Sequence, residues 1–510
     1  MRLTMGLQQS AAHHPARIAT IFGNRRRTYA EVIDRVARFA SGLMAMGAKP
    51  GDRIAILALN SDAYYEAYYA ILWAGCLAVP CNTRWAAAEH VAALADCEPC
   101  VLLVDQHFAQ IVEELPASVR DRIIYIGEAR GRIVAEELID RSSPAADNSG
   151  SDDMPAAIFY TGGTTGTSKG VILSHDNLII NFLACCTVEP HPRDCVYLHV
   201  APMFHLADAA MLLGLTLIGG THAILSRFDP AVVVETIKSC GVNSVLLVPT
   251  MIGMVDQYLR ESPQPLAHVR RLTYGASPIS ETLMMRTLEM FPNARITQAY
   301  GQTELSPVAT FLTHENHVTP EKLRSAGRAI PGVELRIVDS DLATLATGAV
   351  GEILVRGPNG MQGYWRKPEL TAATIVDGWV RTGDAGYIDA DGFLFLVDRV
   401  KDMIVTGGEN VYSAEVENAL AQHAAVLECA VIGVPDDRWG ERVHAVIRFR
   451  PSCGATEDEL TAHCAGLIAR YKRPRTFEFR NEPLPLSGAG KILKTELRKG
   501  HWTSTGRAVN

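Results

Sequence analysis

The sequence lacks the features that mark several classes of protein. It has no block of Lys and Arg, and its 48 basic residues are outnumbered by 56 acidic ones, which gives a net charge of -8. A chain whose main partner is a nucleic acid usually carries a basic patch, so nucleic acid is not an expected partner. The acidic excess is spread along the chain and is interpreted as a solvated surface.

Long apolar runs are also missing. The most apolar stretches, near residues 63–81 and 207–220, are interrupted by charge or too short to span a bilayer, and the N-terminus has no basic segment followed by an apolar one. The eleven cysteines are dispersed, and the pair Cys97 and Cys100 has no second pair at zinc spacing. We therefore expect no transmembrane segment, and a reduced, cytoplasmic location.

The length of 510 residues, 48% of them hydrophobic, predicts two or more domains, because a single core stops growing near ~250 to 300 residues. Strand-like apolar runs alternate with amphipathic, helix-length segments up to about Gly301. These runs lie at residues 53–58, 100–105, 122–126, 197–201, 223–226, 244–248 and 295–300. The pattern predicts an α/β fold with largely parallel sheets in a multi-layer domain of residues 1–400.

Two later regions differ from this pattern. Residues 332–398 hold short strands and turns, which indicates a β-rich subdomain of the large domain. After residue 401 the alternation restarts on a smaller scale, with a helix expected from Ser413 to about Gln422 and strands at 426–434 and 443–449. We expect a separate, small α+β domain of residues 401–510.

Residues 160–170 are the most informative stretch, because they hold four glycines, four threonines and one lysine directly after the apolar run 156–160. Glycine lets the backbone approach an anion, and exposed N–H groups, threonine hydroxyls and a lysine bind phosphates. A Walker loop needs Gly-Lys-Ser/Thr opening a helix, but Lys169 stands between Ser168 and Gly170. An apolar run, 171–173, follows, so the loop joins two strands, with a helix only after Ser174. A plain flexible hairpin is the alternative.

Three more motifs follow at long intervals, each only weakly informative alone: Tyr300-Gly301-Gln302-Thr303-Glu304, Gly378-Trp379-Val380-Arg381-Thr382-Gly383-Asp384, and Pro485-Leu486-Ser487-Gly488-Ala489-Gly490-Lys491-Ile492. Together and in this order, the four motifs resemble the adenylate-forming superfamily of acyl-CoA synthetases, firefly luciferases and peptide-synthetase adenylation domains. The resemblance runs over essentially the whole chain.

The resemblance implies that a carboxylic acid attacks the α-phosphate of ATP, giving an acyl-adenylate, and that Mg²⁺ assists. Glu304 would bind the metal, Thr303 would contact the α-phosphate, and Lys491 would bridge the acid and the α-phosphate. His205 joins these three as a catalytic candidate. The candidates for ATP and AMP binding are Thr161, Gly162, Gly163, Thr164, Thr165, Lys169, Gly275, Ala276, Ser277, Tyr300, Thr303, Asp384, Arg399 and Lys491.

The second half-reaction implied by the resemblance is attack of a thiol, that of coenzyme A, on the adenylate. The small domain would swing about hinge Lys401 between the two half-reactions. Trp439 is suited to stacking on an adenine, and the run 471–475 offers three cations for phosphates. The candidates for binding coenzyme A are Gly407, Gly408, Trp439, Tyr471, Arg473 and Arg475. For these basic residues a solvated surface is the alternative.

The acid pocket that the resemblance implies is apolar, with Phe204, Met211, Met251 and Leu305 as lining residues and no Lys or Arg in its segments. A second carboxylate would be buried there without a partner, so a hydrophobic monocarboxylic acid, fatty or aromatic, is expected. Asp208 is interpreted as a surface or helix-start carboxylate, although amino-acid-activating relatives place an amine-binding aspartate close by.

Three functions stay open at this point. The chain can be a CoA ligase, an adenylating enzyme that passes its acyl group to a separate carrier protein, or a luciferase-like oxygenase. The small-molecule acid, ATP and CoA are the expected partners, and a homodimer is compatible with the sequence. We expect the acid–CoA ligase, which releases AMP and pyrophosphate.

Overall fold

The computed structural model describes residues 1–128, 131–151, 153–161, 168–275, 279–399, 402–406, 409–436, 438–486 and 492–501. It falls into two compact units. The large unit comprises Met1–Leu335 and Val355–Val380, and the small unit comprises Arg336–Leu354 and Arg381–Asn510. The small unit therefore takes in part of the β-rich region, while the boundary expected at residue 400 stays a prediction.

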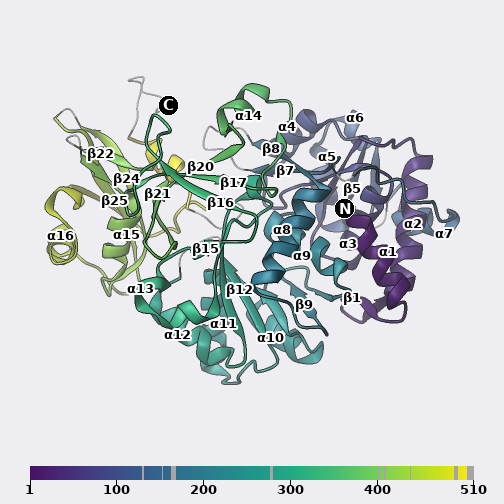
Figure 1. The fold of residues 1–510 in the computed structure, drawn as a ribbon, viewed down its shortest axis with the longest axis horizontal. Helices are drawn as coiled ribbons and strands as arrows, with labels where there is room; N and C mark the ends of the chain where they lie inside the picture. Colours follow the sequence, from purple (N-terminus) through teal and green to yellow (C-terminus); the bar gives the residue numbers. More distant parts are fainter. Residues whose placement is uncertain are drawn as a thin grey trace. The chain divides into compact units, whose positions relative to one another are not determined.

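A nine-stranded sheet forms one layer of the large unit (Figure 1). Its strands, in spatial order, are β15 (Arg328–Ala329), β14 (Thr310–Leu312), β13 (Arg295–Tyr300), β12 (Arg271–Gly275), β11 (Ser244–Leu246), β9 (Val196–His199), β10 (Thr221–Ile224), β1 (Ile18–Phe22) and β2 (Arg25–Thr28). The run from β1 to β13 is parallel, whereas β2, β14 and β15 pair antiparallel at the edges. The carboxyl ends of β12 and β13 therefore lie at one edge.

A seven-stranded sheet forms a second layer. In spatial order its strands are β18 (Gly363–Tyr364), β8 (Lys169–Ser174), β7 (Pro155–Thr161), β4 (Leu77–Pro80), β3 (Arg53–Leu57), β5 (Val101–Val104) and β6 (Ile123–Tyr125). The strands from β7 to β6 are parallel, and β8 runs antiparallel to both β7 and β18. The prediction of an α/β fold with largely parallel sheets is confirmed.

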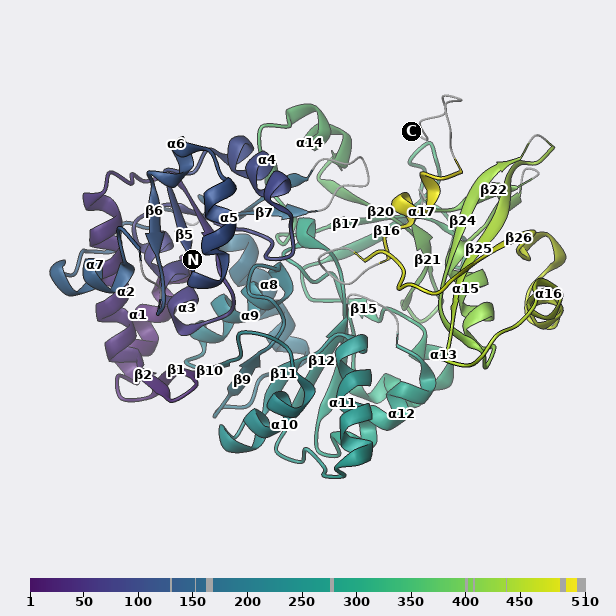
Figure 2. The ribbon, with the colours of Figure 1, turned by 180° about the vertical axis from the view of Figure 1, so that it is seen from behind.

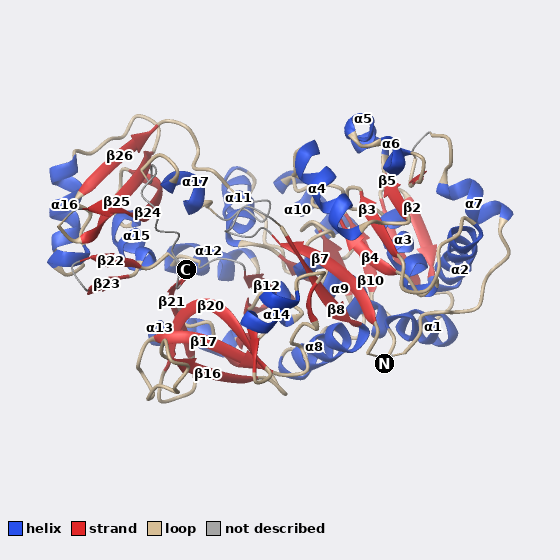
Figure 3. Ribbon diagram, turned by 90° about the horizontal axis from the view of Figure 1, so that it is seen from above, coloured by secondary structure: helices blue, strands red, loops and turns tan. Residues whose placement is uncertain are grey.

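Helix α3 (Asp62–Trp73) lies between the two sheets (Figure 3), and all of its residues are buried. A surface helix buries only one face, so full burial needs neighbours on every side. One apolar cluster joins α3 to Ala19 and Ile224 of the nine-stranded sheet and to Ile54 and Ala78 of the seven-stranded sheet. Helix α3 therefore belongs to the cores of both layers.

Two buried carboxylates of α3 are neutralised by arginines from β2 and from α2 (Tyr29–Ala45). Arg25 donates two hydrogen bonds to Asp62, at 2.8 and 3.0 Å. Arg27 Nη1 lies 2.7 Å from Asp62 Oδ2 and 2.9 Å from Glu66 Oε1, and Arg35 Nε lies 3.0 Å from Glu66 Oε1. A buried charge is tolerated only when it is paired, so these arginines hold α3 in place.

The small unit is built on a sheet with a helical layer on each face (Figure 2). Its strands are β23 (Glu409–Val411), β22 (Ile404–Thr406), β25 (Gly440–Phe449) and β24 (Val426–Asp436), with β26 (Thr476–Arg480) parallel to β25. Helices α15 (Ser413–Ala421) and α16 (Glu457–Ala465) share one apolar cluster, which contains Leu420 and Leu460. Helix α17 (Lys494–Arg498) contributes Leu497 to a different cluster, with Ile432 and Val446. The expected helix and strands of this region are confirmed.

The remaining elements complete the β-rich region and the outer layers. A five-stranded sheet contains β16 (Glu334–Val338), β17 (Gly351–Arg356), β20 (Trp379–Ile388) and β19 (Ile375–Val376), with β21 (Leu394–Arg399) on β20. The other helices are α1 (Leu3–His13), α4 (Ala87–Cys97), α5 (Ala109–Glu114), α6 (Ala117–Arg120), α7 (Ala135–Arg141), α8 (His175–Val188), α9 (Leu206–Leu217), α10 (Pro230–Ser239), α11 (Pro249–Glu261), α12 (Glu281–Met290), α13 (Pro320–Leu323) and α14 (Pro368–Thr374). Among the described residues, no helix is long and apolar enough to cross a membrane.

A substitution at Gly327 tests how tightly the edge of the nine-stranded sheet is packed. Its φ is +83°, and a Cβ atom there would meet the backbone of Phe311 at 1.9 Å, whereas at Gly51, with φ +87°, it would meet nothing within 4 Å. We expect Gly51→Ala to lower the free energy of unfolding by about 1 kcal/mol, the cost of the left-handed backbone alone. Gly327→Ala should lower it by a further ~1 to 3 kcal/mol, because β14 or β15 must shift. Urea denaturation measures both, and equal losses would contradict the packing argument.

Candidate active site

The glycine- and threonine-rich stretch connects two antiparallel strands, as the sequence predicts. Thr161 at the end of β7 is the register partner of Lys169 at the start of β8. Helix α8 begins only at His175, with Ser174 as its N-cap. Gly162, Gly163, Thr164 and Thr165 lie outside the described residues. The strand–loop–strand arrangement is therefore confirmed, and Thr161 and Lys169 are the candidates whose positions are known.

Lys169 lies beside a tyrosine from a distant part of the chain, and this tyrosine in turn contacts a glutamate. Its Nζ is 5.0 Å from the ring centroid of Tyr364, whose strand β18 pairs with β8. The Tyr364 hydroxyl donates a hydrogen bond of 2.9 Å to Glu304 Oε1. Burial and the Glu304 carboxylate raise the pKa of Tyr364, so the phenol stays protonated and donates. A cation, a phenol and a carboxylate are thus brought together at the start of β8.

The turn that carries Thr303 and Glu304 is held by amide side chains. It is a short 3-10 helix, Thr303–Leu305, that follows β13. Asn359 Nδ2 donates to the carbonyl oxygens of Leu305 and Val308, both at 3.0 Å, and Asn181 Nδ2 donates to the same Val308 oxygen at 2.7 Å. Leu305 is fully buried. Glu304 is therefore presented on a backbone segment whose carbonyl groups are satisfied from two other elements.

Two candidates for binding the adenine of ATP lie side by side at the carboxyl edge of the nine-stranded sheet. Gly275 ends β12, Tyr300 ends β13, and Gly275 is the register partner of Ala299. A side chain at position 275 would meet the carbonyl oxygen of Ala299 at 2.5 Å, so only glycine fits there without a shift. Ala276 and Ser277, which follow, lie outside the described residues. The pairing of β12 with β13 brings Gly275 and Tyr300 together.

His205 caps helix α9, and Phe204 before it is buried. The His205 Nδ1 atom accepts a hydrogen bond from the Ala207 N–H at 3.3 Å. Two other residues expected in the acid pocket pack in different clusters: Met211 of α9 lies against Phe182 and Tyr197, and Met251 of α11 joins the core behind β11 and β12. The described residues therefore do not assemble the four expected pocket residues into one apolar cluster.

Of the two alternatives expected for Asp208, a surface or a helix-start carboxylate, the structure shows the helix start, in the first turn of α9. Its side chain is fully buried, and Oδ2 lies 2.8 Å from His199 Nδ1. His199 Nε2 is 2.8 Å from His222 Nδ1, and His222 Nε2 is 3.2 Å from the Thr216 hydroxyl. Burial lowers the pKa of His222 well below its usual value. The carboxylate is buried because this chain of partners satisfies it.

In the small unit, the two candidates for the ribose lie on paired strands. Asp384 of β20 is the register partner of Arg399 of β21. The backbone N–H of Asp384 donates to the Thr382 hydroxyl at 3.1 Å. Lys401, Gly407, Gly408 and Lys491 lie outside the described residues. Strand pairing therefore supports Asp384 and Arg399 as neighbours, and the hinge and the lysine stay predictions.

Among the candidates for coenzyme A, Trp439 and Arg475 come together. The guanidinium carbons of Arg438 and Arg475 lie 4.7 and 4.8 Å from the Trp439 ring centroid. Thr406, the last residue before the two glycines, is the register partner of Gly440. From the sequence, the three cations of residues 471–475 were expected to bind phosphates together, but in the structure they have different partners.

Arg473 and Lys472 are engaged elsewhere. Arg473 donates to the carbonyl oxygens of Ile468 and Ala465, at 3.3 and 3.4 Å. Lys472 forms an ion pair of 2.7 Å with Glu415, and its Nζ lies 5.7 Å from the Tyr471 ring centroid. Of these cations, Arg475 is the one that lies against Trp439.

Comparison with known proteins identifies the family. The model of the AMP-binding enzyme family matches residues 7–365, and that of its C-terminal domain matches residues 415–491. The chain belongs to the AMP-binding enzyme family. A feruloyl-CoA synthase from Amycolatopsis sp. is 39% identical, covering 95% of this chain and 96% of the relative. The fatty acid–[acyl-carrier-protein] ligase ScoC of Streptomyces coeruleorubidus is 34% identical, covering 98% and 96%.

A solved structure extends the likeness to the whole fold. The o-succinylbenzoate coenzyme A synthetase (MenE) from Bacillus subtilis, in complex with ATP and a magnesium ion, superimposes with a TM-score of 0.85. It is 30% identical, and the match covers 96% of this chain and 98% of that one. The resemblance inferred from the four motifs is thus confirmed at the level of family and fold.

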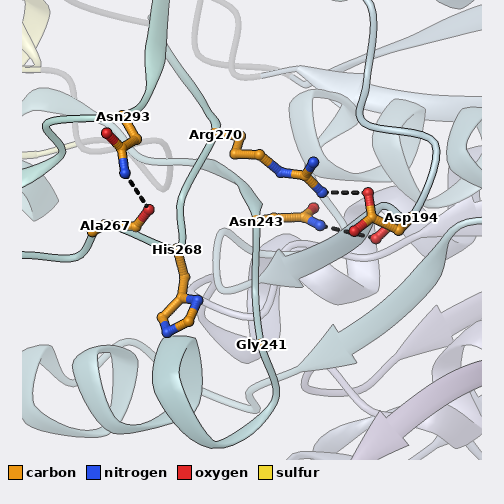
Figure 4. A pocket seen from close by; sticks show the side chains of 7 residues that line it. All are labelled: Asp194, Gly241, Asn243, Ala267, His268, Arg270 and Asn293. Atoms are coloured by element: carbon orange, nitrogen blue, oxygen red, sulfur yellow. Dashed lines mark hydrogen bonds and ion pairs between the residues drawn. The ribbon is translucent and has the colours of Figure 1, made fainter.

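A surface cavity of about 480 Å³ lies away from the family motifs (Figure 4). It is lined by Asp194, Gly241, Asn243, Ala267, His268, Arg270 and Asn293. These residues precede β9, β11, β12 and β13, so the cavity lies at the amino edge of these parallel strands, opposite Gly275 and Tyr300. Ligands of parallel sheets bind at carboxyl edges, and we assign this cavity no part in the chemistry.

Tyr364 is the site residue that the sequence does not reveal, and its hydroxyl can be tested. We expect Tyr364→Phe to weaken binding of Mg²⁺·ATP about tenfold, because a hydrogen bond to a charged group contributes about 1.5 to 3 kcal/mol and orients Glu304. Binding of AMP without metal should not change. Isothermal titration calorimetry measures the affinity of the variant for Mg²⁺·ATP and for AMP.

The matched control is Tyr160→Phe, because the Tyr160 hydroxyl donates to another carboxylate, Asp96 Oδ2, at 2.5 Å. That variant should keep Mg²⁺·ATP affinity within about twofold. If Tyr364→Phe weakens the binding of AMP and of Mg²⁺·ATP equally, the Tyr364 hydroxyl supports the fold rather than orienting Glu304.

Proposed function

We propose that this AMP-binding enzyme is an AMP-forming carboxylic acid–CoA ligase. The substrate carboxylate attacks the α-phosphorus of ATP, the bond to the leaving pyrophosphate breaks, and an acyl-adenylate forms. The thiol of coenzyme A then attacks the acyl carbon, its proton is lost, and AMP leaves. The observation that carries the proposal is the cluster of Lys169, Tyr364 and Glu304 at the start of β8.

This cluster suits the phosphates of ATP. Lys169 supplies a positive charge, and the adjoining residues Thr161, Gly162, Gly163, Thr164 and Thr165 would donate hydrogen bonds. Glu304 is suited to bind Mg²⁺. Its Oε1 accepts the hydrogen bond from Tyr364, and no described residue donates a hydrogen bond to its Oε2. Bound there, Mg²⁺ would neutralise phosphate charge as the α-phosphorus is attacked.

The other roles follow from neighbouring residues. Tyr300 would stack on the adenine beside Gly275, Ala276 and Ser277, and Asp384 with Arg399 would hold the ribose. Thr303 would contact the α-phosphate, and Lys491 would stabilise the charge shared by the acid and the α-phosphate. We place the pivot between the half-reactions at Lys401.

We propose a hydrophobic monocarboxylic acid as the substrate. Phe204 and Leu305 are buried apolar residues that adjoin His205 and Glu304 in the chain, and Met211 and Met251 are partly exposed. The expected acid-pocket segments around these four residues contain no Lys or Arg. A second carboxylate on the substrate would therefore lose its hydration without gaining a partner. An aromatic or fatty acid avoids that cost.

A substrate panel tests this function directly. With ATP and CoA, fatty acids of graded length, benzoates and cinnamates should release AMP with kcat/KM far above acetate, dicarboxylates and amino acids. Each added methylene should contribute up to ~0.8 kcal/mol until the pocket is filled. AMP release is followed with and without CoA. A preference for malonate or an α-amino acid would contradict the proposed apolar pocket. AMP release that does not depend on CoA would contradict CoA as the acceptor.

Transfer to a separate carrier protein is the second candidate, since the relative ScoC is named for it. The Trp439 ring, with the guanidinium groups of Arg438 and Arg475 close to it, favours CoA instead. Coenzyme A carries an adenine and three phosphates beyond its pantetheine arm, whereas a carrier protein presents the arm with a single phosphate and no adenine. An aromatic ring with flanking guanidinium groups suits the adenine and the phosphates.

Trp439→Ala separates the two acceptors. We expect its KM for CoA to rise about tenfold, as loss of stacking of about 1 to 2 kcal/mol implies, while pantetheine as acceptor is unaffected. Pyrophosphate release in the first half-reaction should be unchanged. The control is Phe479→Leu, which alters an exposed aromatic residue on β26 of the same unit. Equal losses with CoA and pantetheine would contradict nucleotide binding at Trp439.

A further inference from the structure

Two histidines and a glutamate converge on one face of the sheet in the small unit. They are His444 of β25, Glu478 of β26 and His501, which follows α17. Their ligand atoms all lie within 4.8 Å of one another. Glu478 Oε2 is 3.9 Å from His444 Nε2 and 3.8 Å from His501 Nε2. The proposed ligase chemistry uses none of the three.

The fold places these side chains by strand register and helix packing. His444 pairs with Thr476, and Val446 pairs with Glu478, in the parallel register of β25 and β26. Residues two apart share a face, so His444, Val446 and Glu478 point to the same side. Val446 packs against Leu497 of α17 on that side, which brings the residues after α17 to the cluster. Figure 2 shows α17 beside β24.

His444 is buried and oriented like a ligand. It is 5% exposed, and its Nδ1 lies 2.8 Å from the Thr476 hydroxyl, which fixes the ring. Its Nε2 has no hydrogen-bond partner among the described residues and points toward Glu478 and His501. A buried nitrogen without a partner costs free energy unless something binds it.

We propose that His444, Glu478 and His501 bind a divalent first-row transition metal ion such as Zn²⁺. Imidazole and carboxylate ligands suit this class, whereas Mg²⁺ and Ca²⁺ prefer oxygen ligands alone. Tetrahedral Zn²⁺ sites place ligand atoms about 3.4 Å apart. The two separations from Glu478 Oε2, 3.9 and 3.8 Å, therefore need to close by about half an ångström, and the two histidine nitrogens, within 4.8 Å of each other, by at most about 1.4 Å. The bound ion fastens residue 501 to strands β25 and β26 of the small unit.

The charges around the cluster define the site further. Arg480 Nε donates to Glu478 Oε1 at 2.5 Å, which orients the carboxylate and leaves Oε2 toward the histidines. Arg442 lies two residues before His444 on β25 and so on the same face of the sheet, where its charge disfavours added positive charge. Glu478 is the carboxylate that offsets these cations. Replacing it should therefore weaken the site as strongly as removing a histidine.

The experiment titrates Zn²⁺ into the chelator-treated full chain under reducing conditions, without ATP, by calorimetry. Wild type should bind one equivalent at this site, and His501→Ala and Glu478→Gln should each bind it at least about tenfold more weakly. The matched control is His463→Gln, because His423 and His463 form another histidine pair in this unit, with ring centroids 5.1 Å apart. It should bind Zn²⁺ as wild type does.

Two further measurements separate binding from a loss of folding. Zn²⁺ should raise the Tm of wild type and of His463→Gln but not of His501→Ala, whose metal-free Tm should match wild type, because His501 is a partly exposed residue. Co²⁺ should give visible absorption bands that His501→Ala lacks. The proposal is overturned if wild type binds no Zn²⁺, if His501→Ala binds it as tightly as wild type, or if Mg²⁺ competes equally.

Discussion

The pairing of β18 with β8 is the constraint on which the candidate active site depends. It consists of two register pairs, Gly363 with Ile172 and Tyr364 with Val171. Through them the Tyr364 ring reaches Lys169 and its hydroxyl reaches Glu304. A slip of one residue would turn Tyr364 to the opposite face of the sheet and separate the three groups. The proximity of Lys169, Tyr364 and Glu304 therefore depends on a very short strand.

Local signals in the sequence predict part of this arrangement and miss the rest for physical reasons. The strand, loop and strand around residues 156–173 are predictable, because each apolar run is continuous and Ser174 caps the next helix. The role of Tyr364 is not, because β18 is too short to show a pattern and its partner lies far away in the chain. Strand β12 was missed as well, since Arg271 opens it and masks its apolar character.

Burial of polar groups is the other property that the sequence could not reveal. Asp208 is placed correctly at a helix start, but its partners His199 and His222 come from β9 and β10, and only sheet formation brings them near. The cations of residues 471–475 illustrate the same limit. They look like one basic surface in the sequence, yet each has a different partner in the fold: Glu415 for Lys472, carbonyl groups for Arg473, and Trp439 for Arg475.

The arginines that pair with the buried carboxylates of helix α3 determine how much of the N-terminal chain the large unit needs. This requirement does not involve the candidate active-site residues. Arg25 and Arg27 belong to an edge strand near the N-terminus, far from every family motif in the chain, yet they hold Asp62 between the two sheets. Shortening the chain past this strand would leave buried carboxylates with fewer partners and expose one side of a core common to both layers. The smallest piece that can carry the active site therefore begins before β2, even though none of the candidate site residues lies there.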